Sequence, residues 1–387
     1  MRTRGHRADL LVVVVFLAIL WMPLADSLFS LDPAPETTEN RELAHFPSFS
    51  LSFSYIEELW RSAGQYGDFF GFRNSLVRWH NRFELDLWGK RFVAGQVVHG
   101  DKGWLYLGWP EALVNWRNAD LYTTSDLASL KVILEERRDW LLGQGIQYLF
   151  VVVPDKETIY PEFYPRGFEK LASESRLDQL GRFLGEQSDV HFLDLRTALR
   201  AAKQTGLLYY RTDTHWNDLG ALVGVREMAL SLSAVLPGVA IPCLDEYSPQ
   251  ASLRPGGDLA GMLSLSGVLP EDVVYLHRRE PIPTTTSSEG LGVNPSGWLF
   301  AVDREGDSNL PRAVVVGDSF AGMAKEFLAL CFDRTVFVRD TAFNSFVQEI
   351  IRKEKPDVVV QMISERYLRL PQAQLAVDVT AGVERTQ

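Results

Sequence analysis

The stretch that most constrains the fold of this chain is Arg312–Phe320, which reads R-A-V-V-V-G-D-S-F. Ala313–Val316 is a run of small or β-branched apolar residues, and such a run is typical of a strand buried on both faces of a parallel sheet. The run ends at Gly317-Asp318-Ser319, and a helix is predicted over Ala321–Leu330. Ser319 is therefore expected on a strand-to-helix turn at the carboxyl edge of the sheet, where open α/β folds bind ligands. The alternative is that Asp318 or Ser319 only caps the helix.

Buried strands alternate with amphipathic helices on both sides of this stretch, and this pattern predicts an α/β fold with a parallel sheet flanked by helices. Tyr148–Val153, Y-L-F-V-V-V, is the clearest of the other strands. The remaining strands are expected at His191–Leu195, Thr335–Val338 and Asp357–Met362, and the helices at Leu127–Gln144, Glu169–Gln187, Arg196–Lys203 and from Gly220 through Ala234.

Three other parts of the chain have a different character. Aromatic and apolar residues recur at helical spacing in Ser52–Lys90, where core packing explains them better than ligand binding. Val97–Tyr106 is predicted to form a hairpin with its turn at Gly100–Gly103. The stretch 237–310 is rich in Pro, Gly, Ser and Thr and has no regular period, so it is expected to be an insertion that leaves the sheet.

The N-terminus predicts that the chain is exported. Arg2, Arg4 and Arg7 precede the apolar stretch Leu10–Ala25, and basic residues before such a stretch stay on the cytoplasmic side. A poor cleavage pattern after Pro23 favours an uncleaved signal anchor over residues 1–30, with a cleaved signal peptide as the alternative. A linker is expected over 31–51, one catalytic-type domain over 52–375 and a short tail over 376–387.

Composition argues against one class of partner, and it leaves open whether the two cysteines form a disulfide. The formal net charge is −11 at pH 7, which argues against a nucleic-acid partner. The two cysteines, Cys243 and Cys331, have no metal-ligand spacing. They either pair in an oxidising compartment or stay as buried thiols, because sequence does not give their separation.

The sequence offers a nucleophile, a base and a carboxylate. A serine hydroxyl such as that of Ser319 needs a neutral imidazole to take its proton, and the imidazole needs a carboxylate to fix its tautomer. Asp213-Thr214-His215 supplies both partners from one short loop, with His215 as base and Asp213 as its orienting group. The alternatives are a structural histidine or a metal site, although the few other histidines lack ligand spacing. No metal and no cofactor are expected.

Val314–Phe320 resembles the nucleophile block of the SGNH (GDSL-type) hydrolases, in which the serine of Gly-Asp-Ser attacks the substrate. In that family the loop with the catalytic Asp and His follows the serine, whereas here Asp213–Gly220 precedes it. These segments fit a circularly permuted version of the SGNH hydrolase fold. In this permuted order, Pro356–Arg366 resembles the strand before the family's Gly-x-Asn-Asp block.

This permuted order is that of the AlgJ/AlgX family of alginate O-acetyltransferases, which the chain resembles over roughly residues 39 to 370. The Asp-Thr-His-Trp and Gly-Asp-Ser-Phe motifs are the most specific elements of the resemblance. Weaker matches are Glu39-Asn40-Arg41, Phe69–Asn74, Gly103–Tyr106 and Val153–Lys156 with Ile159–Glu162. The expected anchor, and a chain too short for the carbohydrate-binding module of AlgX, favour the layout of AlgJ.

One block departs from the hydrolase pattern. Where the hydrolases have Gly-x-Asn-Asp, this chain reads Ser364-Glu365-Arg366-Tyr367, and Arg366 falls where the oxyanion-holding Asn would lie. An arginine there could stabilise an oxyanion, pair with Glu365 or bind a carboxylated sugar. Ser319's own N–H is the expected first oxyanion donor. The further candidates for oxyanion or substrate contacts are Arg366, Glu365, Trp216, Asn217 and Tyr367.

The resemblance implies acetyl transfer to an exported polysaccharide such as alginate, through an acetyl-serine on Ser319. It also implies a periplasmic protein anchored in the bacterial inner membrane, a membrane-bound O-acyltransferase as acetyl donor, and other export subunits as partners. Two alternatives stay open, an SGNH-type acetylesterase and a non-catalytic polysaccharide-binding subunit. Basic residues that could line a groove for a uronic-acid polymer are Arg254, Arg278, Arg279 and Arg366.

Overall fold

Ala313–Val316 forms the middle of a seven-stranded sheet, as its composition predicts. The strand, β10, spans Ala313–Gly317 and is buried along its whole length. The strand order is β5-β4-β12-β10-β11-β9-β8, and the first five strands in this order run parallel to their neighbours. Their bounds are Phe192–Asp194 for β5, Gln147–Val153 for β4, Val358–Ser364 for β12 and Arg334–Arg339 for β11. All four strands predicted beside β10 are confirmed.

The expectation that 237–310 leaves the sheet is wrong for two of the four strands in this stretch. Two of its segments, β8 (Thr284–Ser287) and β9 (Leu299–Arg304), extend the sheet antiparallel beyond β11. Two more, β6 (Tyr247–Arg254) and β7 (Glu271–Arg278), pair as a separate antiparallel ribbon. β6 and β8 are mainly polar, while β7 and β9 contain only short apolar runs, V-V-Y-L and L-F-A-V, within a stretch rich in Pro, Gly and Ser, so the sequence did not mark them as strands. The sheet is therefore mixed.

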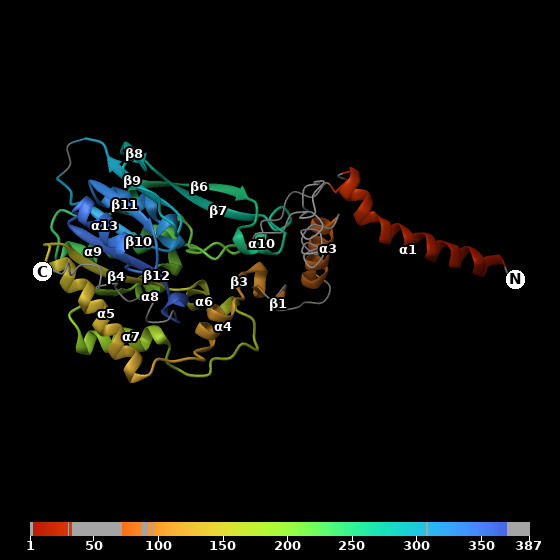
Figure 1. Ribbon diagram of the computed structural model, residues 1–387, viewed down its shortest axis with the longest axis horizontal. Coiled ribbons are helices and arrows are strands. Elements are labelled where there is room, and N and C mark those ends of the chain that lie inside the picture. Colours follow the sequence, from red (N-terminus) through yellow and green to blue (C-terminus); the bar gives the residue numbers. More distant parts are fainter. Residues whose placement is uncertain are drawn as a thin grey trace, which may run out of the picture. The chain divides into compact units, whose positions relative to one another are not determined.

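Helices cover both faces of this sheet (Figure 1). One face packs against α5 (Thr124–Leu142), α7 (Arg176–Gln187) and α13 (Ser345–Glu354), whose apolar residues form one buried cluster with alternate residues of the strands. The other strand residues face a second layer that contains α9 (Asp218–Ser233) and α11 (Ser319–Met323). The sheet thus lies between two helical layers, and its carboxyl edge carries the turn that holds Ser319.

Two helix boundaries differ from expectation. The helix predicted from Glu169 begins at Arg176, because Ser175 and Asp178 form a capping box. The helix predicted over 321–330 is three short turns, α11, α12 (Lys325–Leu328) and η6 (Ala329–Cys331). The other described elements of this unit are η2 (Asp101–Gly103), β3 (Leu105–Leu107), α4 (Pro110–Arg117), α6 (Lys156–Ile159), η3 (Pro161–Phe163), α8 (Arg196–Ala202), η4 (Lys203–Thr205), η5 (Leu244–Glu246) and η7 (Glu365–Arg369).

The computed structural model describes residues 3–29, 31–32, 72–86, 92–93, 96–306 and 309–369. It divides into two compact units, of which the larger, Gly100–Arg254 with Glu271–Gln387, contains everything above. The smaller unit, Met1–His99 with Pro255–Pro270, contains α1 (Thr3–Phe29), α3 (Arg73–Asp86), β1 (Phe92–Val93), β2 (Val97–His99) and α10 (Asp258–Met262). The linker, most of Ser52–Lys90 and the tail, which the sequence analysis addresses, lie outside the described residues.

The basic and apolar N-terminal residues do form a helix, α1, of 27 residues. Within the described ranges, however, no helix combines the length and the apolar character needed to cross a membrane.

Cys243 and Cys331 are free thiols. Cys331 is buried, and its burial raises the pKa of the thiol to about 12. The structure thus favours buried-thiol chemistry for Cys331 and not the disulfide.

Candidate active site

The loop that carries the predicted base is held by a buried lysine. Lys156, which is 2% exposed, donates from Nζ to the carbonyl oxygens of Tyr210, Arg211 and Asp213, at 3.1, 3.1 and 2.6 Å. Lys156 begins α6 directly after the carboxyl end of β4. The loop is also closed on itself by a bridge between Tyr209 and Trp216. Its conformation is therefore fixed by the sheet.

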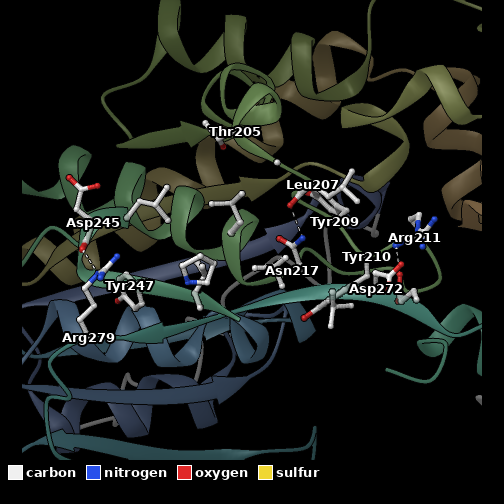
Figure 2. Close-up of a pocket in the computed structure, with 18 residues that line it drawn as sticks. Thr205, Leu207, Tyr209, Tyr210, Arg211, Asn217, Asp245, Tyr247, Asp272 and Arg279 are labelled. Atoms are coloured by element: carbon white, nitrogen blue, oxygen red, sulfur yellow. Dashed lines mark hydrogen bonds between the residues drawn. The ribbon is translucent and has the colours of Figure 1, made fainter. Parts of the chain in front are cut away.

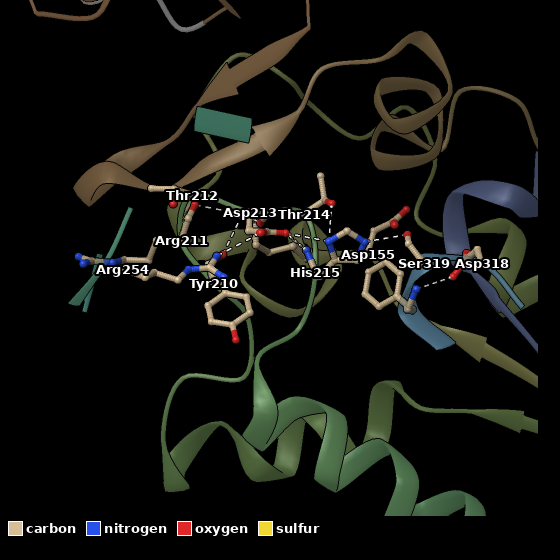
Figure 3. A network of polar contacts seen from close by, with 12 residues as sticks. Asp155, Tyr210, Arg211, Thr212, Asp213, Thr214, His215, Arg254, Asp318 and Ser319 are labelled. Carbon is tan, nitrogen blue, oxygen red and sulfur yellow. Dashed lines mark hydrogen bonds and ion pairs between the residues drawn. The ribbon is translucent and has the colours of Figure 1, made fainter. Parts of the chain in front are cut away.

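The three side chains predicted to act together, Asp213, His215 and Ser319, are linked by consecutive hydrogen bonds (Figure 3). His215 Nε2 is 2.7 Å from Ser319 Oγ, and His215 Nδ1 is 2.8 Å from Asp213 Oδ1. The backbone N–H of His215 also donates to Asp213 Oδ1, at 3.1 Å. A carboxylate can only accept at Nδ1, so the proton of a neutral imidazole lies there and Nε2 can accept the proton of the serine. This geometry suits the activation of a serine hydroxyl as a nucleophile.

Asp318 holds the turn that presents Ser319. Its Oδ1 accepts from the N–H of Phe320 at 2.9 Å, which makes Asp318 the N-cap of α11. Its Oδ2 accepts from the N–H of Ser364, at the end of the neighbouring strand β12, at 2.8 Å. Capping is thus the role of Asp318, and Ser319 is the first helical residue. The carboxylate of Asp318 therefore ties the start of α11 to the end of β12.

Asp213 has a second partner that the motif does not reveal. Arg254, at the end of β6, donates from Nη2 to Asp213 Oδ2 at 3.1 Å and to Glu271 Oε1 at 2.9 Å. Burial pushes the pKa of Asp213 upward, but the hydrogen bonds from His215 and the charge of Arg254 outweigh it and hold this pKa well below its usual range. Asp213 is therefore ionised, and Arg254 places a permanent positive charge beside it.

Glu271 completes this network. It is 2% exposed, lies opposite Arg254 in the β6–β7 ribbon and accepts from the N–H of Arg211 at 2.8 Å and from Thr212 Oγ1 at 2.7 Å. Arg254 also stacks over the ring of Tyr210, with its guanidinium carbon 3.6 Å from the ring centroid. One ion pair thus joins the ribbon to the loop that carries the base.

Arg366 is not placed as an open cation at the reaction centre. Its Nη1 donates to Asp155 Oδ1 at 2.7 Å, and its guanidinium lies 5.4 Å from the ring of Phe320. Glu365 accepts from the N–H of Asp155 at 3.1 Å and from Thr158 Oγ1 at 2.7 Å. Tyr367 packs against the apolar cluster beside the sheet. The three residues of the block that differs from the hydrolase pattern, Glu365, Arg366 and Tyr367, therefore all have structural contacts.

Arg366 sits among buried acids. Burial raises the pKa of Asp155 well above its ordinary range, although Arg366 opposes this shift. Burial likewise raises the pKa of Glu157 to about 7 and that of Glu365 above its ordinary value. Arg366 is thus bound within a buried group of carboxyls through its hydrogen bond to Asp155.

Trp216 and Asn217 also have structural contacts. Trp216 is fully buried, and its ring lies edge-on to that of Phe320, with 5.4 Å between centroids. Asn217 is the N-cap of α9: its Oδ1 accepts from the N–H of Gly220 at 3.0 Å, and its Nδ2 donates to the carbonyl of Leu207 at 2.6 Å. Both residues position the loop that carries His215.

The basic residues considered for a uronate groove do not form one. Arg254 and Arg366 are paired as above, Arg278 binds both oxygens of Glu246 at 2.9 and 3.1 Å, and Arg279 donates to the carbonyl of Asp245 at 3.1 Å. A cavity of about 540 Å³ does lie behind the His215 loop (Figure 2). Its wall includes Tyr209, Tyr210, Tyr247 and Leu276 and is mainly apolar, which does not suit a polyanion.

Sequence reasoning did not find the roles of Lys156, Arg254 and Glu271. Lys156 belongs to Val153–Lys156, a motif of the family that the chain resembles, and this motif was the only sequence signal for its role. Arg254 and Glu271 lie at the ends of β6 and β7, and neither their pairing nor their distance from Asp213 can be inferred from spacing.

Fold and site together define an SGNH-hydrolase-like α/β domain with a serine, histidine and aspartate in hydrogen-bonding sequence. Residues 97–350, about two thirds of the chain, match the model of the SGNH hydrolase-like domain of the acetyltransferase AlgX. The chain belongs to this family of acetyltransferase domains.

Several known proteins are similar to this chain. The probable alginate O-acetylase AlgJ of Pseudomonas aeruginosa is 29% identical over 245 residues, which are 58% of this chain and 60% of that protein. AlgJ of Pseudomonas syringae pv. tomato is 28% identical over 297 residues, 72% of this chain and 67% of that protein. The chain thus matches about two thirds of the length of these curated relatives. The structure of Bacillus cereus PatB1 with a sulfonyl adduct has a TM-score of 0.52 at 14% identity, covers 72% of this chain and 99% of PatB1, and supports the fold.

Proposed function

We propose that this protein is an O-acetyltransferase that moves acetyl groups onto hydroxyls of an exported polysaccharide such as alginate. The observation that carries the proposal is the 2.7 Å contact between His215 Nε2 and Ser319 Oγ, with Asp213 on the other ring nitrogen at 2.8 Å. In the first half-reaction Ser319 Oγ attacks the carbonyl carbon of the donor's acetyl group, and its proton passes to His215 Nε2. His215 then returns this proton to the leaving group of the donor, and an acetyl ester on Ser319 remains.

The second half-reaction runs through the same groups. A sugar hydroxyl gives its proton to His215 Nε2, and its oxygen attacks the carbonyl of the acetyl ester. The bond from this carbonyl to Ser319 Oγ breaks, and the proton on His215 returns to Oγ, so that free enzyme and acetylated sugar result. Asp213 stays ionised throughout, and it stabilises the imidazolium and holds the tautomer.

The N–H of Ser319 is the proposed first donor to the oxyanion of each tetrahedral intermediate. It lies at the start of α11, where backbone N–H groups point out of the helix and favour negative charge. The caps from Asp318 orient this end of the helix, and they do so before substrate binds.

Membership of the AlgX-like family and similarity to probable alginate O-acetylases support the choice of acetyl transfer to alginate. The acetyl donor proposed is a membrane-bound O-acyltransferase that passes acetyl groups outward, with other subunits of polysaccharide export as partners. The location proposed is the periplasm, because basic residues precede an apolar N-terminal stretch. A C-terminal alkaline phosphatase fusion tests the location: activity in intact cells is expected, and an inactive but full-length fusion would contradict it.

The experiment for the activity uses the full chain and two readouts. An aryl sulfonyl fluoride should label wild-type protein at Ser319, and Ser319→Ala should abolish labelling with an unchanged melting temperature. With an acetyl ester as donor and an alginate oligosaccharide as acceptor, acetylated sugar is expected. Absence of labelling in folded wild-type protein would refute catalysis by Ser319. Hydrolysis of the ester without transfer would identify an acetylesterase instead.

A further inference from the structure

Three carbonyl oxygens of the loop 209–217, which carries His215, converge on one buried cation. They belong to Tyr210, Arg211 and Asp213, and Lys156 Nζ lies 3.1, 3.1 and 2.6 Å from them. Because Lys156 is buried, its ammonium has exchanged water for these carbonyl oxygens, and their number matches its three N–H donors. Carbonyl oxygens that point at one place repel each other through their partial negative charges. The conformation of this loop therefore depends on the positive charge at its centre.

Two aromatic rings also face this ammonium. Nζ lies 5.6 Å from the ring centroid of Trp104 and 5.2 Å from that of Tyr106, and both rings are buried. Between them in the chain, Leu105 of β3 donates its N–H to the carbonyl of Arg211 at 2.9 Å. Aromatic faces attract a cation without offering it a hydrogen bond. Carbonyl oxygens together with aromatic faces suit a small monovalent cation, and Lys156 supplies one at the end of its side chain.

The carbonyl of Asp213 connects this cation to the proposed base. It makes the shortest of the three contacts, 2.6 Å, and the side chain of the same residue turns back onto His215. Asp213 Oδ1 accepts from the N–H of His215 at 3.1 Å and lies 2.8 Å from Nδ1, which is the arrangement of an Asx-turn. A held carbonyl fixes the peptide plane between Asp213 and Thr214, and this plane sets the position of His215, whose Nε2 lies 2.7 Å from Ser319 Oγ.

We propose that Lys156 is a positioning residue that acts as a built-in monovalent cation, and that its ammonium holds the loop 209–217 where His215 can take the proton of Ser319. The inference rests on the proposed function and adds to it a charged group that neither touches substrate nor exchanges a proton. Because backbone carbonyls define the site, a free ammonium ion can occupy it once the lysine side chain is shortened. If Lys156 only filled space in the core, an apolar side chain of similar length would serve as well.

The first test removes the charge and keeps the bulk. The rate at which an aryl sulfonyl fluoride labels Ser319 is measured in the full chain, because labelling needs the activated serine but neither acetyl donor nor acceptor. In Lys156→Met labelling should slow by about 100-fold, the loss expected when a catalytic group is displaced by about 1 Å. The circular dichroism spectrum should stay that of wild type. A folded Lys156→Met that labels at the wild-type rate would overturn the proposal.

The second test returns the cation from solution. In Lys156→Ala, ammonium chloride should raise the labelling rate about tenfold over tetramethylammonium chloride of equal concentration, because only ammonium is small enough and has N–H groups for the carbonyls. The choice of salt should not affect Lys156→Met, whose side chain fills the site. Equal rates in the two salts for folded Lys156→Ala would overturn the proposal. If Lys156→Ala unfolds in tetramethylammonium chloride, ammonium chloride should raise its melting temperature, and equal melting temperatures would overturn the proposal in the same way.

The matched control is Lys203→Ala. Lys203 Nζ also binds a carbonyl, that of Ile159, at 2.8 Å, and it lies 4.5 Å from the ring of Tyr160, but these partners are outside the loop 209–217. Lys203→Ala should label at the wild-type rate in both salts. Failure of labelling in folded wild-type protein would refute the proposed function, whereas wild-type labelling without a loss in Lys156→Met would refute the role of Lys156 alone.

Discussion

Arg254 binds Asp213 through Oδ2, at 3.1 Å, while His215 faces the other oxygen of the same carboxylate at 2.8 Å. One carboxylate therefore lies between a permanent cation and an imidazole that the proposed reaction protonates. Arg254 stabilises ionised Asp213, and it also opposes the positive charge that Asp213 attracts to His215. The ribbon β6–β7 thus contributes to the proton affinity of the site as well as to its geometry.

Replacement of the carboxylate tests the role of Asp213. In Asp213→Asn the amide group can donate to Nδ1, which favours the wrong tautomer of His215 and leaves Nε2 protonated. We expect kcat/KM for a small acetyl ester to fall by about 10⁴, the size of this effect in a serine protease triad. The control is Asp272→Asn, at the position next to Glu271 in β7, which should keep wild-type activity. A loss of less than tenfold in Asp213→Asn would show that His215 needs no carboxylate partner.

Loss of the Arg254 charge should change the pH dependence of the reaction. In Arg254→Gln the pKa of Asp213 rises, the Asp213–His215 pair holds a proton more tightly, and the acidic limb of the kcat/KM profile should move up by about one pH unit or less. Arg254→Lys keeps the charge and should restore the position of the limb. A purely structural role would lower the rate of Arg254→Gln without moving the limb, and that result would contradict the electrostatic role.

Buried Glu157 should make stability depend on pH. Burial raises its folded-state pKa from 4.5 to about 7, so between these values the folded protein binds a proton that the unfolded chain releases. Stability is therefore fully present below about pH 4.5, falls as pH rises toward 7 by at most about 1.4 kcal/mol per unit, and is level above. Urea unfolding across this range should show a smaller fall in Glu157→Gln.

The matched control for this effect is Glu162→Gln, since Glu162 is an exposed carboxylate close by in the chain. This variant should keep the wild-type dependence of unfolding free energy on pH. Equal slopes in wild type and Glu157→Gln would mean that the proton is bound elsewhere in the group of Asp155, Glu157 and Glu365.

Two glycines in helices should respond in opposite directions to a methyl group. At Gly224 in α9 a Cβ would lie 2.7 Å from the buried ring of Trp216, so Gly224→Ala should cost about 1–3 kcal/mol of unfolding free energy. At Gly185 in α7 a Cβ meets nothing within 4 Å, so Gly185→Ala should stabilise by about 0.5–1 kcal/mol. Urea titration measures both, and a neutral Gly224→Ala would show that the loop of His215 can shift without cost.

The segments that the sequence predicted correctly are those with a strong local pattern. Central strands such as Tyr148–Val153 and Ala313–Val316 are buried on both faces, so their apolar runs identify them without tertiary information. The edge strand β8 was missed because its residues, T-T-T-S, are polar, and β9 was missed because its short apolar run, L-F-A-V, lies in a stretch rich in Pro, Gly and Ser. The start of α7 was misplaced because the capping box at Ser175 decides it.

The candidate site also has a part that the sequence predicted and a part that only the structure showed. Sequence by itself selected Ser319, His215 and Asp213 as candidates, because each residue type has a role in the proposed chemistry and two of the three share a loop. Only the tertiary structure decided their distances, the engagement of Arg366 with Asp155, and the pairing of Arg254 with Asp213. The reason is physical: a hydrogen bond between residues far apart in the chain depends on strand order and register, and nothing in local composition encodes these for strands that bury little.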